Sequence, residues 1–355
     1  MTLNMENIGV LIINLGTPDA PDAASVRRYL GEFLSDPRVV EIPQLLWQPI
    51  LRGPILLTRP AKSAKAYQEV WTDKGSPLAV YTCETAAALQ KITGSEVMVD
   101  WAMRYGSPSI AERLNAMIAA GCDRVLLAPL YPQYCAATTA TALDACYATL
   151  ADLRAQPAIR TLPPYFAEAA YIEALRSSTE SQLAKLDFKP DLLVASFHGM
   201  PERTRDLGDP YYDQCRATAN LLQEALGREV RLSFQSRFGR AKWLGPATDE
   251  TLRELPGQGV RSVAVLTPGF SADCLETLEE IAIRGQEEFL AAGGQAFTHL
   301  RCLNASPEAI ILYRELIGRE LAGWVQEAFR PVQHGGDYGQ SCHRNGRNTR
   351  HRRSD

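Results

Sequence analysis

Short apolar runs alternate along this chain with longer amphipathic stretches, and this alternation constrains the fold more than any other feature. Six apolar runs predict strands, at residues 8–15, 97–103, 124–131, 191–197, 230–234 and 262–267. Six amphipathic stretches predict helices, at residues 82–92, 109–120, 137–153, 168–186, 211–226 and 275–291. Strands that alternate with helices of this length predict parallel sheets built from βαβ units. Such sheets bind ligands at the carboxyl ends of their strands.

The two halves of the chain resemble each other weakly. LIINLGTP at residues 11–18 returns in outline as VASFHGMP at 194–201, and GCDRVLLAPLY at 121–131 returns as GVRSVAVLTPGF at 259–270. The similarity predicts an α/β fold with two Rossmann-like domains, each a parallel sheet flanked by helices. Chance similarity between βα units is the alternative. Leu15 occupies the position that His198 takes in the second half, so we expect the second half to supply the reactive groups.

We place the domains at residues 6–165 and 166–330. The first half holds about 45 more residues than the second between equivalent glycines, and we assign them to an insertion at about 37–80, rich at its start and middle in Leu, Ile, Trp and Pro. Residues 331–355 are rich in Gly, Asn and Arg and almost free of aliphatic side chains. Such a segment cannot bury enough apolar surface to fold alone, so we expect a disordered basic tail.

Composition and charge exclude several classes of protein. Of the 355 residues, 46% are hydrophobic and 22% charged, as in soluble globular proteins, and the net charge of −4 gives no support for a nucleic-acid partner. No run approaches the ~18 apolar residues of a membrane span, and no basic region with an apolar core begins the chain. We therefore expect a cytoplasmic protein. Eight cysteines without a CxxC pair indicate buried free thiols.

His198 is the first candidate for chemistry. It follows an apolar strand, Gly199 lets the chain turn, and Pro201 ends the strand. Imidazole is the side chain that serves as base or metal ligand near neutral pH. A loop histidine without a task is the alternative.

Glu276 is the second candidate. Asp273-x-x-Glu276 fits a capping box at the start of a helix, which would make Glu276 structural. In the functional alternative, Glu276 points into a cleft. Glu276 and Glu280 share a helix face, where like charges cost a few tenths of a kcal/mol. A metal or proton path would explain that arrangement, and a solvated face would tolerate it.

Three further segments follow predicted strands and combine aromatic with polar residues. Residues 234–250 hold Trp243 among phenylalanines and arginines, which suits a flat, anionic, π-rich ligand. YPQYCAATT begins at Tyr131, and WAMRYGSPS carries Arg104 and Tyr105 at a strand end. Each segment also reads as an ordinary loop. The chain contains no dinucleotide fingerprint, P-loop or HExxH motif.

Taken together, these segments resemble the ferrochelatase family over most of residues 9–330. The similar segments are SFHGMP with GDPY at 208–211, QSRFG…WLGP…TDE, YPQY…TT, RYG and GFSADCLETLEEI. The resemblance is to the bacterial branch. It implies an enzyme that inserts Fe²⁺ into protoporphyrin IX, the last step of haem synthesis, in a porphyrin cleft between the two domains.

The resemblance also implies roles for residues. His198 and Glu276 would face each other at the metal-insertion site as catalytic groups and iron ligands, and Glu280 would continue an acidic path. Porphyrin would contact the following residues: Arg59, Arg104, Tyr105, Tyr131, Trp243 and Phe270. Residues 43–67 would form an apolar lip over the ring, and their prolines at 49 and 54 argue against one regular helix. An ordinary pair of core helices is the alternative.

The sequence departs from the family in three respects. Some members hold a [2Fe–2S] cluster with tail cysteines, whereas this tail has only Cys342, so we predict no cluster and no permanently bound cofactor. Cys274 replaces a histidine found in some members. Arg284 stands where others extend the acidic face, which argues against a metal-entry path beyond Glu280.

Partners other than the substrates are weakly constrained. An apolar substrate favours peripheral contact with a membrane, and the sequence does not indicate an oligomeric state. Three rival functions remain at this level: a chelatase for cobalt, nickel or coproporphyrin, a non-catalytic porphyrin carrier, and a periplasmic binding protein.

Overall fold

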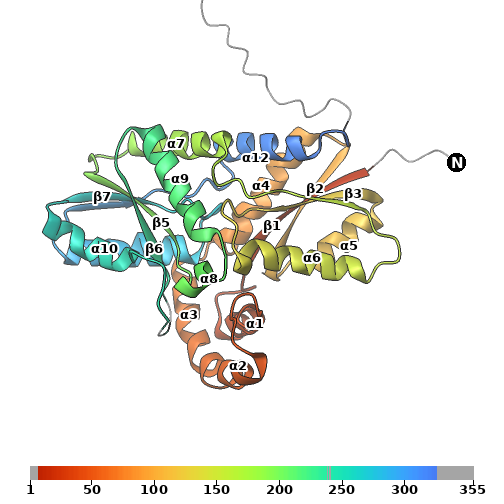
Figure 1. The fold of residues 1–355 in the computed structure, drawn as a ribbon, viewed down its shortest axis with the longest axis horizontal. Coiled ribbons are helices and arrows are strands. Elements are labelled where there is room, and N and C mark those ends of the chain that lie inside the picture. The colour runs from red at the N-terminus through yellow and green to blue at the C-terminus, as the bar shows by residue number, and fades with distance from the viewer. Residues whose placement is uncertain (1–6, 238, 240, 326–355) are drawn as a thin grey trace, which may run out of the picture.

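The computed structural model describes residues 7–237, 239 and 241–325. It contains two parallel four-stranded sheets with the same strand pattern, β2-β1-β3-β4 and β6-β5-β7-β8 (Figure 1). The first sheet comprises β1 (Asn7–Thr17), β2 (Val97–Gly106), β3 (Cys122–Pro129) and β4 (Ala158–Thr161). The second comprises β5 (Leu192–His198), β6 (Val230–Gln235), β7 (Ser262–Leu266) and β8 (Ala296–His299). The expected fold class is confirmed, and the weak internal repeat corresponds to two sheets of one topology.

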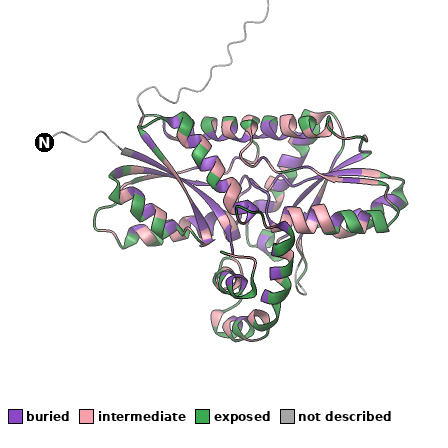
Figure 2. Cartoon of the chain, turned by 180° about the vertical axis from the view of Figure 1, so that it is seen from behind, coloured by how far each residue is buried: buried purple, intermediate pink, exposed green. Residues whose placement is uncertain are grey.

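Helices cover both faces of the first sheet. Alternate residues of β1 point to opposite faces of the sheet. Val10 and Ile12 pack with Leu89 of α4 on one face, while Leu11 and Ile13 pack against α5 and α6 on the other. These helices are α4 (Pro77–Thr93), α5 (Ile110–Ala119), η2 (Ala136–Ala140) and α6 (Thr141–Ala151). Buried on both sides, the central strands are the purple ribbons of Figure 2. This burial is why they read as unbroken apolar runs.

The second sheet follows the same plan. Its helices are α7 (Ala169–Leu183), α8 (Glu202–Asp206), α9 (Tyr211–Leu226), α10 (Thr248–Glu254), η3 (Leu255–Gln258), η4 (Glu276–Gly285) and α11 (Gln286–Ala291). Leu193, Ala195 and Phe197 face the α9 side, while Leu192 and Val194 face the η4 side. The segment η4 is a ten-residue π-helix, a geometry that is frequent at functional sites.

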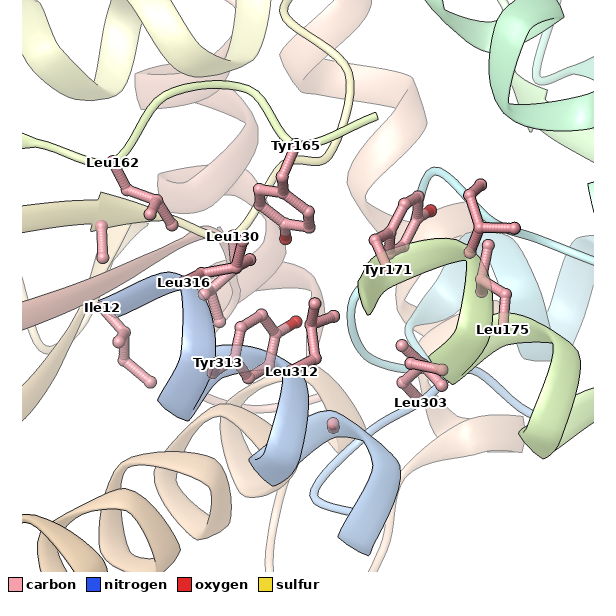
Figure 3. Packing of buried hydrophobic residues seen from close by; sticks show 14 of the residues in the cluster. Ile12, Leu130, Leu162, Tyr165, Tyr171, Leu175, Leu303, Leu312, Tyr313 and Leu316 are labelled. Carbon is pink, nitrogen blue, oxygen red and sulfur yellow. The ribbon is translucent and has the colours of Figure 1, made fainter. Parts of the chain in front are cut away.

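The last described helix, α12 (Pro307–Glu320), lies beside α7 and returns to the first half, where it contacts α4 and β3. Ser306 caps its first turn by accepting a hydrogen bond from the Ala309 N–H. Tyr313 and Leu316 of α12 join Ile12 of β1 and Tyr171 of α7 in one apolar cluster (Figure 3). The two halves therefore share a continuous hydrophobic core. The domain limits at 165 and 166 stay a prediction.

A helical protrusion interrupts the first half between β1 and α4, at the bottom of Figure 1. It consists of α1 (Ala23–Phe33), α2 (Gln44–Ile50), η1 (Leu51–Ile55) and α3 (Leu56–Val70). The backbone leaves helical geometry at Gly53, between the two prolines, so the segment is not one regular helix, as predicted. We call residues 43–67 of this protrusion the lip.

Among the described residues, no helix has both the length and the apolar character that crossing a membrane requires. The seven cysteines in this part of the chain are free thiols. The predicted tail at 331–355 lies outside the described residues.

Candidate active site

The carboxyl ends of the central strands open into one cleft with a cavity volume of about 130 Å³. Both halves line it. Leu15 at the end of β1 and His198 at the end of β5 are both lining residues, which confirms the equivalence drawn from the internal repeat. Phe33 of the protrusion and Phe270 add aromatic walls.

Gly16 and Gly199 permit this arrangement by close backbone approach. Gly16 has φ +125°, and a side chain there would collide with the backbone oxygen of Tyr105. A Cβ at Gly199 would lie 2.5 Å from the Gln235 oxygen, to which the Gly199 N–H donates at 2.7 Å. Glycine is therefore required at both positions, because any side chain would push apart the strand ends that carry Leu15 and His198 to the cleft.

His198 is held in one tautomer. Its Nδ1 lies 2.7 Å from the Gly199 carbonyl oxygen, and a carbonyl only accepts, so Nδ1 carries the proton. Nε2 of the neutral ring is then the atom with a free lone pair. The Tyr211 hydroxyl donates to the His198 carbonyl oxygen at 3.0 Å and fixes the backbone there. The ring lies 6.5 Å from that of Phe270.

Glu276 lines the same cleft at the first residue of η4. Burial raises the pKa of the Tyr67 and Tyr29 hydroxyls well above the ordinary value, and the nearby Glu276 charge raises it further. Both phenols line the cleft and stay protonated beside the carboxylate. Burial, followed by the Glu276 charge, also raises the pKa of Cys274, so this residue is a neutral thiol rather than a thiolate.

The capping-box interpretation of Glu276 is wrong. The Asp273 N–H donates to Asn304 Oδ1 at 2.8 Å instead of to Glu276. Thr277 receives the Cys274 N–H at 3.0 Å, so the threonine takes the capping role. The Asp273 carboxylate is buried in an ion pair with Arg301. Since tertiary partners satisfy Asp273, Glu276 is left to face the cleft.

The structure does not bring all the predicted porphyrin contacts to the cleft surface. Tyr131 and Phe270 line it, and the Tyr131 hydroxyl has no hydrogen-bond partner. Arg104 and Tyr105 lie one layer behind, and Tyr105 is 0% exposed with its ring 5.1 Å from that of Phe33.

Arg104 and the Tyr105 hydroxyl bind Asp36, with the hydroxyl at 2.8 Å. Burial opposes ionisation of Asp36, but hydrogen bonds from Thr141, a backbone N–H and Tyr105 lower its pKa. Arg104 and Tyr105 thus support the wall of the cleft.

Three further predicted residues lie outside the lining. Trp243 forms a backbone bridge with Pro201 and packs beneath Gly199, next to the His198 turn. Arg59 is exposed on α3. Glu280 accepts from the Ser236 N–H at 2.7 Å and from the Ser236 hydroxyl at 2.5 Å, so its carboxylate secures the loop after β6.

Several lining residues escaped the sequence analysis. Asn14, Tyr29, Tyr67 and Gln133 all face the cleft. Asn14 carried a signal, because it is the polar residue within a buried apolar run. Its Nδ2 donates to Thr82 at 3.1 Å and to Ser271 at 3.2 Å, joining the two halves. In the described part of the chain, no group of three or more His, Cys, Asp or Glu could enclose a metal ion.

Two equivalent sheets with a cleft at their carboxyl ends define a chelatase-like fold. SirB from Bacillus subtilis with Fe³⁺ has this fold, with a TM-score of 0.55 and 13% identity over 89% of this chain and 96% of that chain. A family model described as Ferrochelatase matches residues 7–321. The curated ferrochelatase of Rhodopseudomonas palustris strain TIE-1 is 52% identical over 90% of this chain and 95% of its own length. The curated ferrochelatase of Rhizobium meliloti strain 1021 is 51% identical over 90% of this chain and 96% of its own length. This chain belongs to the ferrochelatase family and is an enzyme that inserts metal into porphyrin.

Proposed function

We propose that the chain inserts Fe²⁺ into protoporphyrin IX to form protohaem, with His198 and Glu276 acting at the centre of the ring. The observation that carries the assignment of residues is their presence in one cleft with aromatic walls. Curated relatives named ferrochelatase, about half identical along most of the chain, support the reaction.

The reaction sets three requirements. The planar ring hides its nitrogen lone pairs, two pyrrole N–H protons must leave, and Fe²⁺ must lose water. A cleft with fixed walls that fits the bent ring better than the flat one lowers the barrier by differential binding. The walls here are fixed by buried contacts such as Asn14 to Ser271.

His198 Nε2 is the candidate proton acceptor, because Nδ1 already donates to the Gly199 carbonyl. Glu276 supplies an anionic carboxylate beside two neutral phenols, Tyr29 and Tyr67. Imidazole and carboxylate both suit Fe²⁺, so the pair could divide proton removal and metal delivery between the two faces of the ring.

An anaerobic insertion assay with Fe²⁺ and protoporphyrin tests this function. We expect His198→Ala to reduce turnover at least about 100-fold while porphyrin still binds, since a positioned general base contributes about 10²–10⁴-fold. Unchanged turnover would remove His198 from the mechanism. A panel of cobalt, nickel and coproporphyrin separates the rival chelatases, and a porphyrin carrier would give binding spectra without metal insertion.

We also propose that the lip touches a membrane surface from which the apolar substrate arrives. Leu45 is 92% exposed, Leu46 65% and Leu57 64%. Arg52 and Lys62 are exposed on the same protrusion. Apolar side chains with basic neighbours suit an anionic lipid surface.

Co-sedimentation with vesicles that contain anionic phospholipid tests the lip. We expect the double change Leu45→Ser, Leu46→Ser to weaken binding several-fold. Ile311→Ser is the matched control, because Ile311 is 67% exposed on α12, at the opposite end of the molecule from α2 (Figure 1). Equal binding of both variants would contradict the proposal.

Two assignments follow from this function. We assign the cytoplasm as the compartment, because seven free thiols in the described chain suit a reducing environment. Iron enters as a substrate, and we infer that the enzyme works without a permanently bound cofactor. Arg59 on α3 stays our candidate contact for a propionate of the porphyrin.

A further inference from the structure

Helix α9 of the second half holds the cleft wall that the first half contributes. Residues 133–136, which we call the wall segment, follow β3 and lie between the lining residues Tyr131 and Thr138. The Ala136 N–H donates to Asp209 Oδ2 at 2.8 Å, and the Tyr134 N–H donates to Gln214 Oε1 at 2.7 Å. Farther along α9, Thr218 receives Gln133 Nε2 at 2.9 Å. Two of these contacts tie the wall segment to α9, and the third ties it to Asp209, two residues before the helix begins.

The other oxygen of the Asp209 carboxylate leads to His198. Asp209 Oδ1 accepts the Tyr211 N–H at 3.0 Å, which fixes the start of α9. The Tyr211 side chain is buried, and its hydroxyl donates to the His198 carbonyl oxygen at 3.0 Å. Asp209 is therefore connected to His198 through Tyr211 alone, and to the wall segment by one hydrogen bond. It does not line the cleft itself.

The position suits a carboxylate in particular. Ala136 begins η2, which continues into α6, and Tyr211 begins α9, so the two donated N–H groups are unpaired first-turn groups of two helical segments. Both helix dipoles favour a negative charge at this point. An ionised carboxylate accepts with two oxygens, whereas an asparagine amide accepts with only one.

We propose that Asp209 is a positioning residue for metal insertion, which sets the separation between the wall segment and His198 and thereby the bending of the bound ring. The inference rests on the proposed function. Displacement of a catalytic group by about 1 Å can cost about 100-fold in rate, so a small change in this separation is sufficient to affect turnover. Binding of the flat ring depends on the apolar walls, which Asp209 does not contribute.

The test is Asp209→Asn in the full chain, assayed with protoporphyrin and anaerobic Fe²⁺. We expect kcat to fall at least about tenfold with KM for porphyrin changed by less than about twofold. We also expect weaker out-of-plane Raman bands from bound protoporphyrin, since a looser wall bends the ring less. Asp213→Asn is the matched control, because Asp213 lies on α9 with 52% of its side chain exposed and forms only exposed ion pairs, with Arg205 at 3.5 Å and with Arg216 at 3.3 Å. We expect its kcat within about twofold of the parent.

Unchanged kcat and Raman bands in Asp209→Asn would overturn the inference, as would a lower kcat with undiminished ring distortion. If Asp209→Asn does not fold, Gln214→Ala removes the neighbouring tie to Tyr134 and must show the same loss of kcat and distortion. A parent protein without iron insertion would overturn the proposed function itself. An active parent with an equally active Asp209→Asn would overturn only the role of Asp209.

Discussion

Replacing Asp273 by Asn should destabilise the protein more than any exposed charge change. Asp273 lies just before η4 and is 0% exposed. Its carboxylate accepts from Arg301 Nε, from Asn304 Nδ2 at 2.7 Å, from Thr277 Oγ1 at 3.1 Å and from the Cys302 N–H at 3.2 Å. Because Thr277 belongs to η4, these contacts anchor the helix that carries Glu276.

The magnitude follows from the donors that lose their acceptor. In Asp273→Asn an NH₂ group replaces one oxygen and faces the Arg301 and Asn304 donors. Hydrogen bonds to charged groups contribute about 1.5–3 kcal/mol each, and breaking a buried ion pair costs about 3–5 kcal/mol. The Arg301 side chain is 49% exposed and regains water, so we expect the lower end, about 3 kcal/mol. At about 2 °C per kcal/mol for a large domain, Tm should fall by about 6 °C.

The pH dependence has a defined sign. Burial raises the pKa of Asp273, but positive charge on His299 and Arg301 and the hydrogen bonds outweigh burial and lower it below 3.8. Burial also lowers the pKa of His299 to about 4, so Arg301 is the cation at neutral pH. A carboxyl group whose pKa is lower in the folded state than in the unfolded state stabilises the protein at pH values above its unfolded-state pKa. This stabilisation is lost as the pH falls through the folded-state pKa. The free energies of unfolding of the parent and of Asp273→Asn should therefore differ fully at pH 7 and begin to converge as the pH falls below about 4.

Thermal and urea unfolding at pH 7, 5 and 3.5 measure this difference. Glu168→Gln is the control, since Glu168 pairs with Arg319 at 2.9 Å with both side chains about 40% exposed, and exposed pairs contribute about 0–1 kcal/mol. If Asp273→Asn costs no more than this control, or if its effect grows on acidification, the account of the anchor is wrong.

Three further predictions concern activity. Glu276→Gln should reduce turnover at least about 100-fold with Tm changed little, because Asp273 and Thr277 rather than Glu276 secure the start of η4; a large fall in Tm with normal turnover would contradict this. Glu280→Gln should lower the free energy of unfolding by about 1–2 kcal/mol through weaker bonds to Ser236, and KM for Fe²⁺ should stay unchanged. A raised KM for iron would instead support Glu280 as part of a metal path. Deletion of residues 331–355 should leave specific activity unchanged, and an iron–sulfur absorbance in the parent that disappears on deletion would refute the prediction that no cluster is bound.

Strand prediction succeeded for all strands of five or more residues, including the edge strands β2 and β6. Central parallel strands such as β5 are the clearest, because they carry apolar residues on both faces. The missed strands, β4 and β8, have four residues each and lie at sheet edges. Half-buried edge positions accept mixed residues, so neither strand leaves an apolar run in the sequence.

The candidate site divides in a similar way. His198 could be found because it is the last residue of the buried strand β5, and Glu276 because it begins the amphipathic segment that follows β7. Tyr29 and Tyr67 could not, since their place depends on how α1 and α3 pack together, and helix packing is not encoded in local periodicity. Tyr105 shows the opposite error, because a strand end also points residues into the layer behind the site.

The path of α12 has a consequence for any attempt to separate the halves. This helix is the last one in the described part of the chain, yet it packs against α4 and β3 of the first half. A polypeptide cut after residue 165 would lack that cover, and the remaining fragment would present Tyr313 and Leu316 to water. Neither fragment should be stable when produced by itself, and co-expression of the pair would be needed to recover the enzyme.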